Sequence, residues 1–307
     1  MPPLRSIVDV DDLSDAEILD ILDQAESMRC GEAPPRRAGL VAGLMFEEPS
    51  VRTKFGFAAA AARAGGTSIE LPLPYREPTM SGSETLADLI LAVSGYVSVI
   101  ICRFSNVAAI DEVARASLVP VINGGAASVS HPSQALIDLF AMRRHFGHVD
   151  GLRIGIMGDI ATSRSAKSLM RLMARNDPAE VRLMHPGAGT LDLQEMHVAV
   201  PASMGARWRD LGAHRDLQGL DVIYMAGFPA GNELQQKDPE RLGERSRLSI
   251  SREVARDLAE HALILCPMPR IDEIAPDLDG HPAMGMFRQS QDGLHVRRAL
   301  LGFVTGA

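Results

Sequence analysis

The residues best suited to binding or catalysis lie in the segment 46–54, with the sequence Phe-Glu-Glu-Pro-Ser-Val-Arg-Thr-Lys. An apolar run typical of a buried strand precedes it, and a helical pattern follows it. Ser50, Arg52 and Thr53 are therefore expected at a helix N-terminus, where backbone N–H groups and a partial positive charge attract anions. Hydroxyls and cations at this position predict a phosphate site. An ordinary helix cap is the alternative, which Ser-x-Arg-Thr alone does not exclude.

Other polar residues are expected at the same kind of position. Arg103, Asn123, Asp159 and Cys266 lie at or just after the ends of predicted strands, and His131 and Arg164 begin two of the helices that follow. The carboxyl ends of parallel strands form the ligand-binding edge of such sheets. Guanidinium, imidazole and amide groups suit a doubly charged phosphate beside a polarised carbonyl. A structural ion pair between Asp159 and Arg164, and an ordinary helix-start role for His131, are the alternatives.

The elements that must position these residues alternate along the chain. Predicted strands span 40–45, 67–73, 97–103, 119–122, 153–157, 180–185, 222–225 and 262–266. Predicted helices span 14–29, 51–63, 84–94, 107–117, 131–145, 164–175 and 288–305, the last interrupted by Gly293. This alternation predicts an α/β fold with two doubly wound parallel-sheet domains and helices on both faces of each sheet. The stretches 73–84 and 226–249 are expected to be long loops.

Composition limits the function further. The chain has 307 residues and a net charge of −8, which argues against nucleic acid or an anionic membrane surface as a partner. The three cysteines include no Cys-x-x-Cys pair, so we expect neither a disulfide framework nor a metal site, and Cys102 and Cys266 are expected to be buried. No apolar run approaches the ~20 residues of a membrane-spanning helix. Since the first residues also lack a signal-peptide pattern, we expect a cytoplasmic protein.

Three motifs connect these observations. The sequence contains Phe46-x-Glu-Pro-Ser-x-Arg-Thr, then His131-Pro-x-Gln-x-Leu-x-Asp-Leu, then Pro267-x-Pro-Arg-x-Asp-Glu-Ile. In this order and spacing they resemble the aspartate/ornithine carbamoyltransferase family, and within it the aspartate carbamoyltransferases, over nearly the whole chain. The resemblance implies transfer of the carbamoyl group of carbamoyl phosphate to a primary amine, without a metal or organic cofactor. A nicotinamide oxidoreductase is disfavoured because Gly-x-Gly-x-x-Gly is absent.

The resemblance also implies roles for individual residues. Ser50, the backbone of Val51, Arg52 and Thr53 would hold the phosphate, and Arg103 would bridge the phosphate and the carbonyl oxygen. The catalytic set would be Arg52, Thr53, Arg103 and His131, with His131 and Thr53 donating to the carbonyl oxygen. The carbamoyl NH₂ would be held by Gln134 and by the carbonyl groups of Pro267 and Met268, and Arg164 would take the carboxylate of the amine.

The implied domains are a carbamoyl phosphate-binding domain over residues 1–147, completed by the helix 288–305, and an acceptor-binding domain over 148–287. The family also implies a homotrimer, or a multiple of trimers, with sites at the subunit interfaces.

Two departures from the family pattern concern the acceptor. A loop lysine that reaches the neighbouring subunit's site in aspartate carbamoyltransferases is replaced by Gly82, and Arg76 is the only cation left in that loop. The arginine that grips the aspartate side chain is replaced by Gly227, followed by Phe228 and Pro229.

We therefore predict an acceptor pocket that includes Arg164, Gly227, Phe228, Pro229 and Met268, and an acceptor amino acid other than L-aspartate. The alternatives are an ordinary aspartate carbamoyltransferase with a rewired pocket, or a weakly active homologue that binds carbamoyl phosphate or serves as a scaffold.

Overall fold

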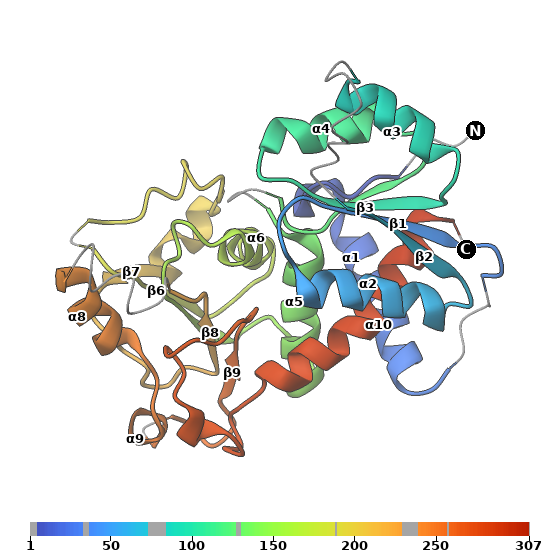
Figure 1. The fold of residues 1–307 in the computed structure, drawn as a ribbon. Coiled ribbons are helices and arrows are strands. Elements are labelled where there is room, and N and C mark those ends of the chain that lie inside the picture. Colours follow the sequence, from blue (N-terminus) through green and yellow to red (C-terminus); the bar gives the residue numbers. More distant parts are fainter. Residues whose placement is uncertain are drawn as a thin grey trace. The chain divides into compact units, whose positions relative to one another are not determined.

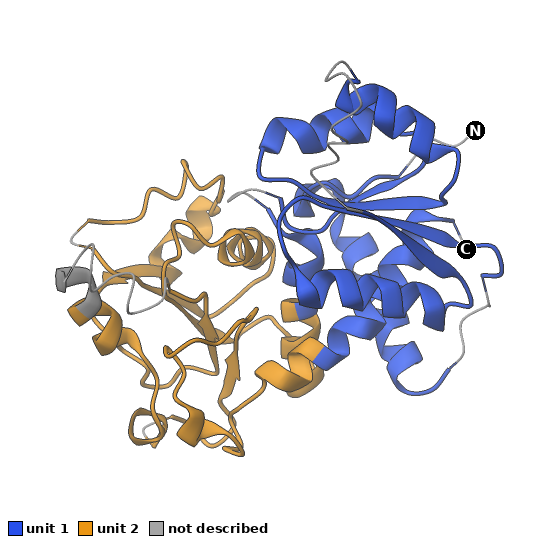
Figure 2. Cartoon of the chain, in the orientation of Figure 1, with its two compact units in different colours: residues 1–137, 291–307 blue, residues 138–290 orange. Residues whose placement is uncertain are grey.

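The computed structural model describes residues 5–32, 37–72, 84–126, 130–187, 189–228, 239–256 and 258–306. The chain forms two compact units, which Figure 2 shows in different colours. Unit 1 comprises residues 1–137 and 291–307, and unit 2 comprises residues 138–290. Each unit is built around one parallel β-sheet, which confirms the predicted α/β fold.

The sheet of unit 1 has the strand order β2-β1-β3-β4. Its strands are β1 (Val41–Phe46), β2 (Thr67–Pro72), β3 (Val99–Arg103) and β4 (Val121–Asn123). Its helices include α1 (Asp15–Arg29), α2 (Val51–Arg63), α3 (Leu86–Ser94) and α4 (Val107–Ala116). In Figure 1, α3 and α4 cover one face of this sheet, and α2 lies on the other face. The strands are nearly continuous apolar runs because both faces are covered.

The sheet of unit 2 has the strand order β7-β6-β5-β8-β9. Its strands are β5 (Arg153–Met157), β6 (Glu180–Met184), β7 (Trp208–Gly212), β8 (Val222–Met225) and β9 (Leu263–Leu265). Its helices include α6 (Arg164–Met173), α8 (Pro239–Leu248) and α9 (Arg252–Ala255). Two longer helices, α5 (Pro132–Phe146) and α10 (Met286–Val304), contribute residues to both units. The units divide within α5, at Ile137, whereas the sequence suggested a boundary at its end.

Several elements differ from the sequence-based expectation, among them the short helix α9, which was not predicted. Strand β7 was not predicted, and α8 lies inside the stretch 226–249 that was expected to be a loop. Helix α10 continues through Gly293 without a break. A Cβ atom at Gly293 would lie 2.7 Å from a guanidinium nitrogen of Arg297, so the missing side chain makes room for that arginine instead of ending the helix.

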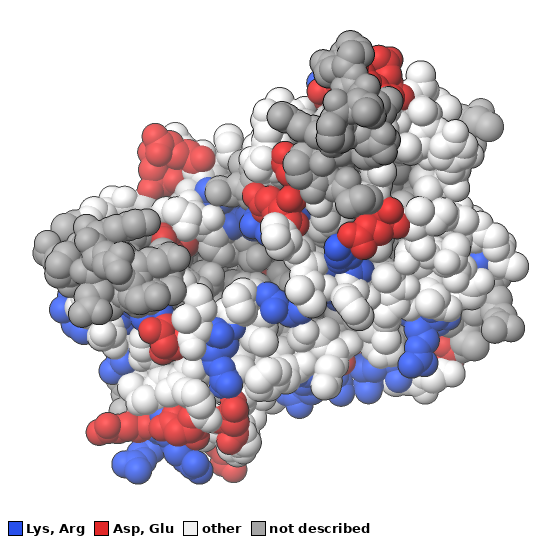
Figure 3. Space-filling model, in the orientation of Figure 1, with Lys and Arg blue, Asp and Glu red and all other residues white. Residues whose placement is uncertain are grey.

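The surface of the molecule carries mixed charge. Figure 3 shows acidic and basic side chains interspersed over the described part of one face. No helix in the described part of the chain is long and apolar enough to cross a membrane. Cys102 and Cys266 are buried, as predicted, and burial raises the pKa of the Cys102 thiol to about 12.

Candidate active site

The N-terminus of α2 lacks a side-chain cap. Ser50 occupies the cap position, but its hydroxyl makes no capping hydrogen bond and instead accepts one from Nη1 of Arg103, at 3.3 Å. The equivalent residues of α1, α3, α4 and α6, which are Ser14, Thr85, Asn106 and Ser163, all cap their helices. The first turn of α2 also carries no acidic residue. Its backbone N–H groups therefore remain available to an anion, which argues against the ordinary-cap alternative.

Arg103 is held at the end of β3 by the segment that follows β1. Its Nε donates to Oε2 of Glu48 at 3.0 Å, and its side chain is only 12% exposed. Glu47 accepts hydrogen bonds from the backbone N–H and the hydroxyl of Ser105, at 2.8 and 2.7 Å. These two bonds lower the pKa of Glu47. The two acidic residues of the motif thus tie the loop to β3, and Arg103 is oriented toward Ser50.

The remaining cations and hydroxyls of the motif differ in exposure. Thr53 is buried, whereas Val51 and Arg52 are exposed. Lys54 forms an ion pair with Glu70 of β2, so its charge is engaged on the neighbouring strand. The exposed guanidinium of Arg52 and the buried hydroxyl of Thr53 lie in the first turn of α2, as the sequence predicted.

The loop after β4 positions His131. The side-chain oxygen of Asn123 accepts hydrogen bonds from the backbone N–H groups of Gly125 and Ala126, both at 2.8 Å. Gly125 has a φ of 101°, and a Cβ there would lie 2.6 Å from the imidazole ring. Only glycine allows the loop to pass so close to His131. His131 and Gln134 are both buried at the start of α5, and Nδ1 of His131 lies 3.4 Å from the hydroxyl of Ser133.

The register of the unit 1 sheet brings these positions to one edge. Phe46 pairs with Arg103, and Cys102 pairs with Asn123, so β1, β3 and β4 end side by side. The α2 N-terminus, Arg103 and the loop that leads to His131 all follow these three strand ends. The arrangement supplies N–H donors, hydroxyls and guanidinium groups suited to a phosphate, with an imidazole on the same edge.

Unit 2 places another set of predicted residues at the edge of its own sheet. Met157 of β5 pairs with Met225 of β8, and the backbone N–H of Asp159 donates to the carbonyl of Gly227 at 2.9 Å. Arg164 is the first residue of α6, which begins a few residues after β5. The ends of β5 and β8 are therefore adjacent. An Asp159–Arg164 ion pair and a role for Arg164 in binding both remain predictions.

Gly227 adopts a left-handed conformation, with φ of 88°. Apart from the two neighbours of Gly227 in the chain, no atom of the described residues would lie within 4 Å of a Cβ at this position. Phe228 is buried, and its ring centroid lies 5.5 Å from the guanidinium carbon of Arg245 in α8. Arg245 donates to Asp272 at 2.6 Å, and the carboxylate of Glu273 lies 3.9 Å away.

The loop that contains Pro267 and Met268 is fixed by buried polar groups. The backbone N–H of Cys266 donates to Oε1 of Gln289 at 3.0 Å, and Nε2 of Gln289 donates to Asp138. Met268 has a φ of 64°, which is unusual for a residue with a side chain, and its N–H lies 3.3 Å from the sulfur of Cys266. A strained, tightly bonded loop is a common feature of binding sites.

Comparison with protein families identifies the chain. The carbamoyl-P binding domain of the aspartate/ornithine carbamoyltransferases matches residues 5–144, and the Asp/Orn binding domain of the same enzymes matches residues 150–304. The chain belongs to the aspartate/ornithine carbamoyltransferase family. It is therefore an enzyme of the carbamoyltransferase class.

Individual relatives agree with this family. The aspartate carbamoyltransferase catalytic subunit of Hyperthermus butylicus is 33% identical over 304 residues, which cover 98% of this chain and 95% of the relative. The chloroplastic aspartate carbamoyltransferase of Oryza sativa is 31% identical and aligns with 93% of this chain and 78% of the relative. Aspartate transcarbamoylase from Trypanosoma cruzi in complex with carbamoyl phosphate has a similar fold. Its TM-score is 0.87 at 26% identity, over 98% of this chain and 97% of that structure.

Two of the predicted carbamoyltransferase site residues, Arg76 and Pro229, lie outside the described residues. Two residues beside the candidate site were not predicted from the sequence. Arg245 carries the charge beside Phe228, and Gln289 supports the loop 266–268. Asp272 and Glu273, in the motif that begins at Pro267, indicated that a cation such as Arg245 would lie beside them, but no sequence pattern pointed to Gln289.

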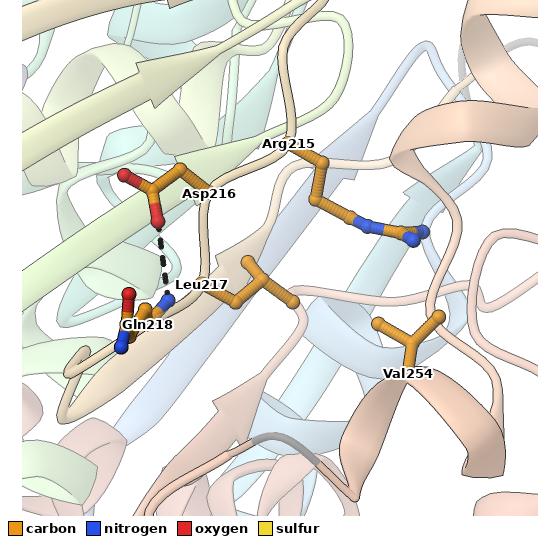
Figure 4. A pocket seen from close by; sticks show the side chains of 5 residues that line it. All are labelled: Arg215, Asp216, Leu217, Gln218 and Val254. Carbon is orange, nitrogen blue, oxygen red and sulfur yellow. Dashed lines mark hydrogen bonds between the residues drawn. The ribbon is translucent and has the colours of Figure 1, made fainter.

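One cavity in unit 2 stands apart from these groups. It has a volume of about 500 Å³ and is lined by Arg215, Asp216, Leu217, Gln218 and Val254 (Figure 4). Within it the backbone N–H of Gln218 donates to Asp216 at 3.3 Å, and Arg215 donates to the carbonyl of Ser249 at 2.9 Å. None of the predicted site residues lines this cavity, so we assign it no part in carbamoyl transfer.

Proposed function

We propose that this carbamoyltransferase moves the carbamoyl group of carbamoyl phosphate to an amino acid other than L-aspartate. The uncapped N-terminus of α2, with Ser50 bonded to Arg103, supports binding of the phosphate group. The observation that carries the choice of acceptor is Gly227, which offers no cation where the family pattern has an arginine.

The proposed reaction is a direct displacement. The amine nitrogen attacks the carbonyl carbon, a C–N bond forms, the C–O bond to phosphate breaks, and the amine's proton passes to the leaving phosphate. Arg103, Thr53 and His131 stabilise the negative charge that develops on the carbonyl oxygen, while Arg52 and the α2 N–H groups hold the leaving phosphate. Gln134 and the carbonyl groups of Pro267 and Met268 orient the carbamoyl NH₂. Correct positioning of the two substrates supplies much of the rate.

Acceptor choice follows from the charges in unit 2. Arg164 binds the carboxylate that every amino acid carries. A second carboxylate beside Gly227 and Phe228 would lack a free cation, since the nearby Arg245 is already engaged by Asp272 and Glu273. An unpaired charge in a closed site costs several kcal/mol. The proposed acceptor therefore has a neutral side chain.

The proposal includes a homotrimer in which Arg76 of one subunit reaches the site of its neighbour. An arginine there would replace the point charge of the family's lysine with a planar donor fork. Two rival functions are an ordinary aspartate carbamoyltransferase, in which another cation compensates for Gly227, and a weakly active homologue that binds carbamoyl phosphate or acts as a scaffold.

A phosphate-release assay with carbamoyl phosphate and a panel of amines tests the proposal. The panel contains L-aspartate, L-ornithine, and amino acids with neutral side chains. We expect kcat/KM for at least one neutral amino acid to exceed that for L-aspartate by about 10-fold or more. Efficient turnover of L-aspartate, with KM in the common range of ~1 μM to 1 mM, would favour the ordinary enzyme. Absence of turnover with every amine would favour the weakly active homologue.

A further inference from the structure

Arg297 of α10 is a buried arginine pressed against the phosphate-site helix. The residue is only 4% exposed, and its guanidinium carbon lies 5.7 Å from the ring centroid of Phe57 in α2. A Cβ at Gly56 would lie 2.5 Å from its Nη1, and a Cβ at Gly293 would lie 2.7 Å from the same atom. The guanidinium thus fills a space between α2 and α10 that two glycines leave open.

This buried cation lacks a counter-charge within the described part of the chain. No described carboxylate or hydrogen-bond acceptor pairs with Arg297, and its Nε is buried without a partner. Burial lowers the pKa of Arg297 to about 10, and the charge of Arg52 acts in the same direction. The group remains protonated at neutral pH. The aromatic face of Phe57 offsets only part of the cost of burying an unpaired charge.

The position of Arg297 relates it to the phosphate site. Gly56, which the guanidinium contacts, follows Arg52 by four residues and so lies on the same face of α2, about 6 Å further along the helix. Repulsion between the two guanidinium groups disfavours an Arg52 side chain that folds back along α2. The repulsion favours an Arg52 side chain that extends toward the N-terminus of α2. The partial positive charge of the helix lies at the same end, so the two positive charges are located together.

We propose that Arg297 is a positioning residue of the phosphate site: a buried cation that orients Arg52 and is neutralised by the dianionic phosphate group bound at the N-terminus of α2. This inference rests on the proposed function, because it requires carbamoyl phosphate to bind at Ser50–Thr53. It adds a second layer of positive charge beneath residues that contact the ligand directly.

The test compares neutral and charged replacements. Arg297→Met and Arg297→Gln remove the charge, and Arg297→Lys keeps it. Arg298→Met is the matched control, because Arg298 is the next residue of α10 and lies beside Arg63 at the opposite end of α2. Binding of carbamoyl phosphate and of inorganic phosphate is measured by calorimetry, and melting temperature is measured with and without phosphate.

We expect the neutral variants to lose affinity for both anions by roughly 10- to 30-fold, because one positive charge near the anion is lost. We also expect their melting temperature without ligand to equal or exceed that of the wild type, because an unpaired buried charge has been removed. Arg297→Lys should stay within about 3-fold of wild-type affinity, and Arg298→Met should be unchanged.

Unchanged affinity in the neutral variants, or an equal loss in Arg297→Lys, overturns the inference. Failure of both neutral variants to fold also overturns it, since that result would make Arg297 a structural residue. A wild-type protein that binds neither anion refutes the proposed function itself, which is a distinguishable outcome.

Discussion

In unit 1, the carboxyl ends of β1, β3 and β4 present Ser50, Arg103 and His131, each fixed by a specific contact from a neighbouring loop or strand. In unit 2, the equivalent end of β8 presents Gly227 and Phe228, which carry no charge. The described part of unit 1 thus presents groups suited to a phosphate, whereas the described residues at the end of β8 include no cation for a second carboxylate. Because the two sets lie on different sheets, the acceptor can change while the chemistry of the leaving phosphate stays the same.

The largest effect is expected from a change to the phosphate-site residues of unit 1. Arg52→Ala should weaken carbamoyl phosphate binding by roughly 100- to 1,000-fold, because a cation opposing a dianion is lost. Calorimetry measures the affinity directly. Arg63→Ala, at the other end of α2, is the control and should bind normally. Equal affinity in Arg52→Ala and the wild type would remove the phosphate site from α2.

A smaller effect is expected for the loop cation. Once an acceptor is known, Arg76→Ala should lower kcat about 100-fold if this guanidinium stabilises the transition state in a neighbouring subunit. Turnover is measured at saturating carbamoyl phosphate, and sedimentation gives the oligomeric state of the same sample. Wild-type turnover in the variant would show that Arg52, Arg103 and the N-terminus of α2 supply all the positive charge that the leaving phosphate needs.

The proposed role of Gly227 in unit 2 can be tested by placing a positive charge at that position. Gly227→Arg should raise kcat/KM for L-aspartate about 10-fold, since a guanidinium can pair with the second carboxylate. No atom of the described residues outside the adjoining backbone blocks a Cβ at this position, but the left-handed backbone costs about 1 kcal/mol for a residue with a Cβ. Gly227→Ala is the control, because it carries the same backbone cost without the charge. A similar response to L-aspartate in both variants would show that charge at this position does not select the acceptor.

The smallest effect concerns a polar cluster in unit 2 that serves stability alone. Burial tends to raise the pKa of Asp210, but hydrogen bonds from the N–H groups of Leu191 and Gly212 and from His185 outweigh it, so the net pKa is lowered. A lowered pKa contributes stability above the ordinary value of 3.8 that is lost as the pH falls below it.

Asp210→Asn should therefore destabilise the protein by about 1–2 kcal/mol at pH 7 and by less near pH 3. Urea denaturation at both pH values measures the difference. Carbamoyl phosphate affinity at pH 7 should not change. A pH-independent loss of stability would show that Asp210 acts through packing instead of charge.

The sequence predicted the central elements better than the peripheral ones. Strands β1, β3, β5 and β8 are continuous apolar runs because the fold covers both their faces. Strand β7 is at the sheet edge and half-exposed, so its residues carry no such pattern and it was missed. Helix α8 is strongly polar, and its sequence could not be distinguished from a loop.

The candidate site shows a similar division. Residues proposed to contact the ligand, such as Ser50 and His131, belong to motifs, and the family resemblance that those motifs carry predicted their roles. Arg245, Gln289 and Arg297 were not found, because a charged or amide side chain in a helix is ordinarily exposed. Their burial results from packing between elements distant in the sequence, as with Gly56 against Arg297.

The hydroxyl of Ser50 is turned toward Arg103 and does not cap α2. The first turn of α2 therefore lacks the side-chain oxygen that accepts a backbone hydrogen bond at the start of helices such as α1 and α6. A bound phosphate would supply that oxygen, so the metabolite would complete the first turn of the helix. Amide hydrogen exchange in that turn would then report how much carbamoyl phosphate is present, and the folding equilibrium would shift with its concentration. The enzyme would be most resistant to unfolding and proteolysis in cells that have substrate for it to use.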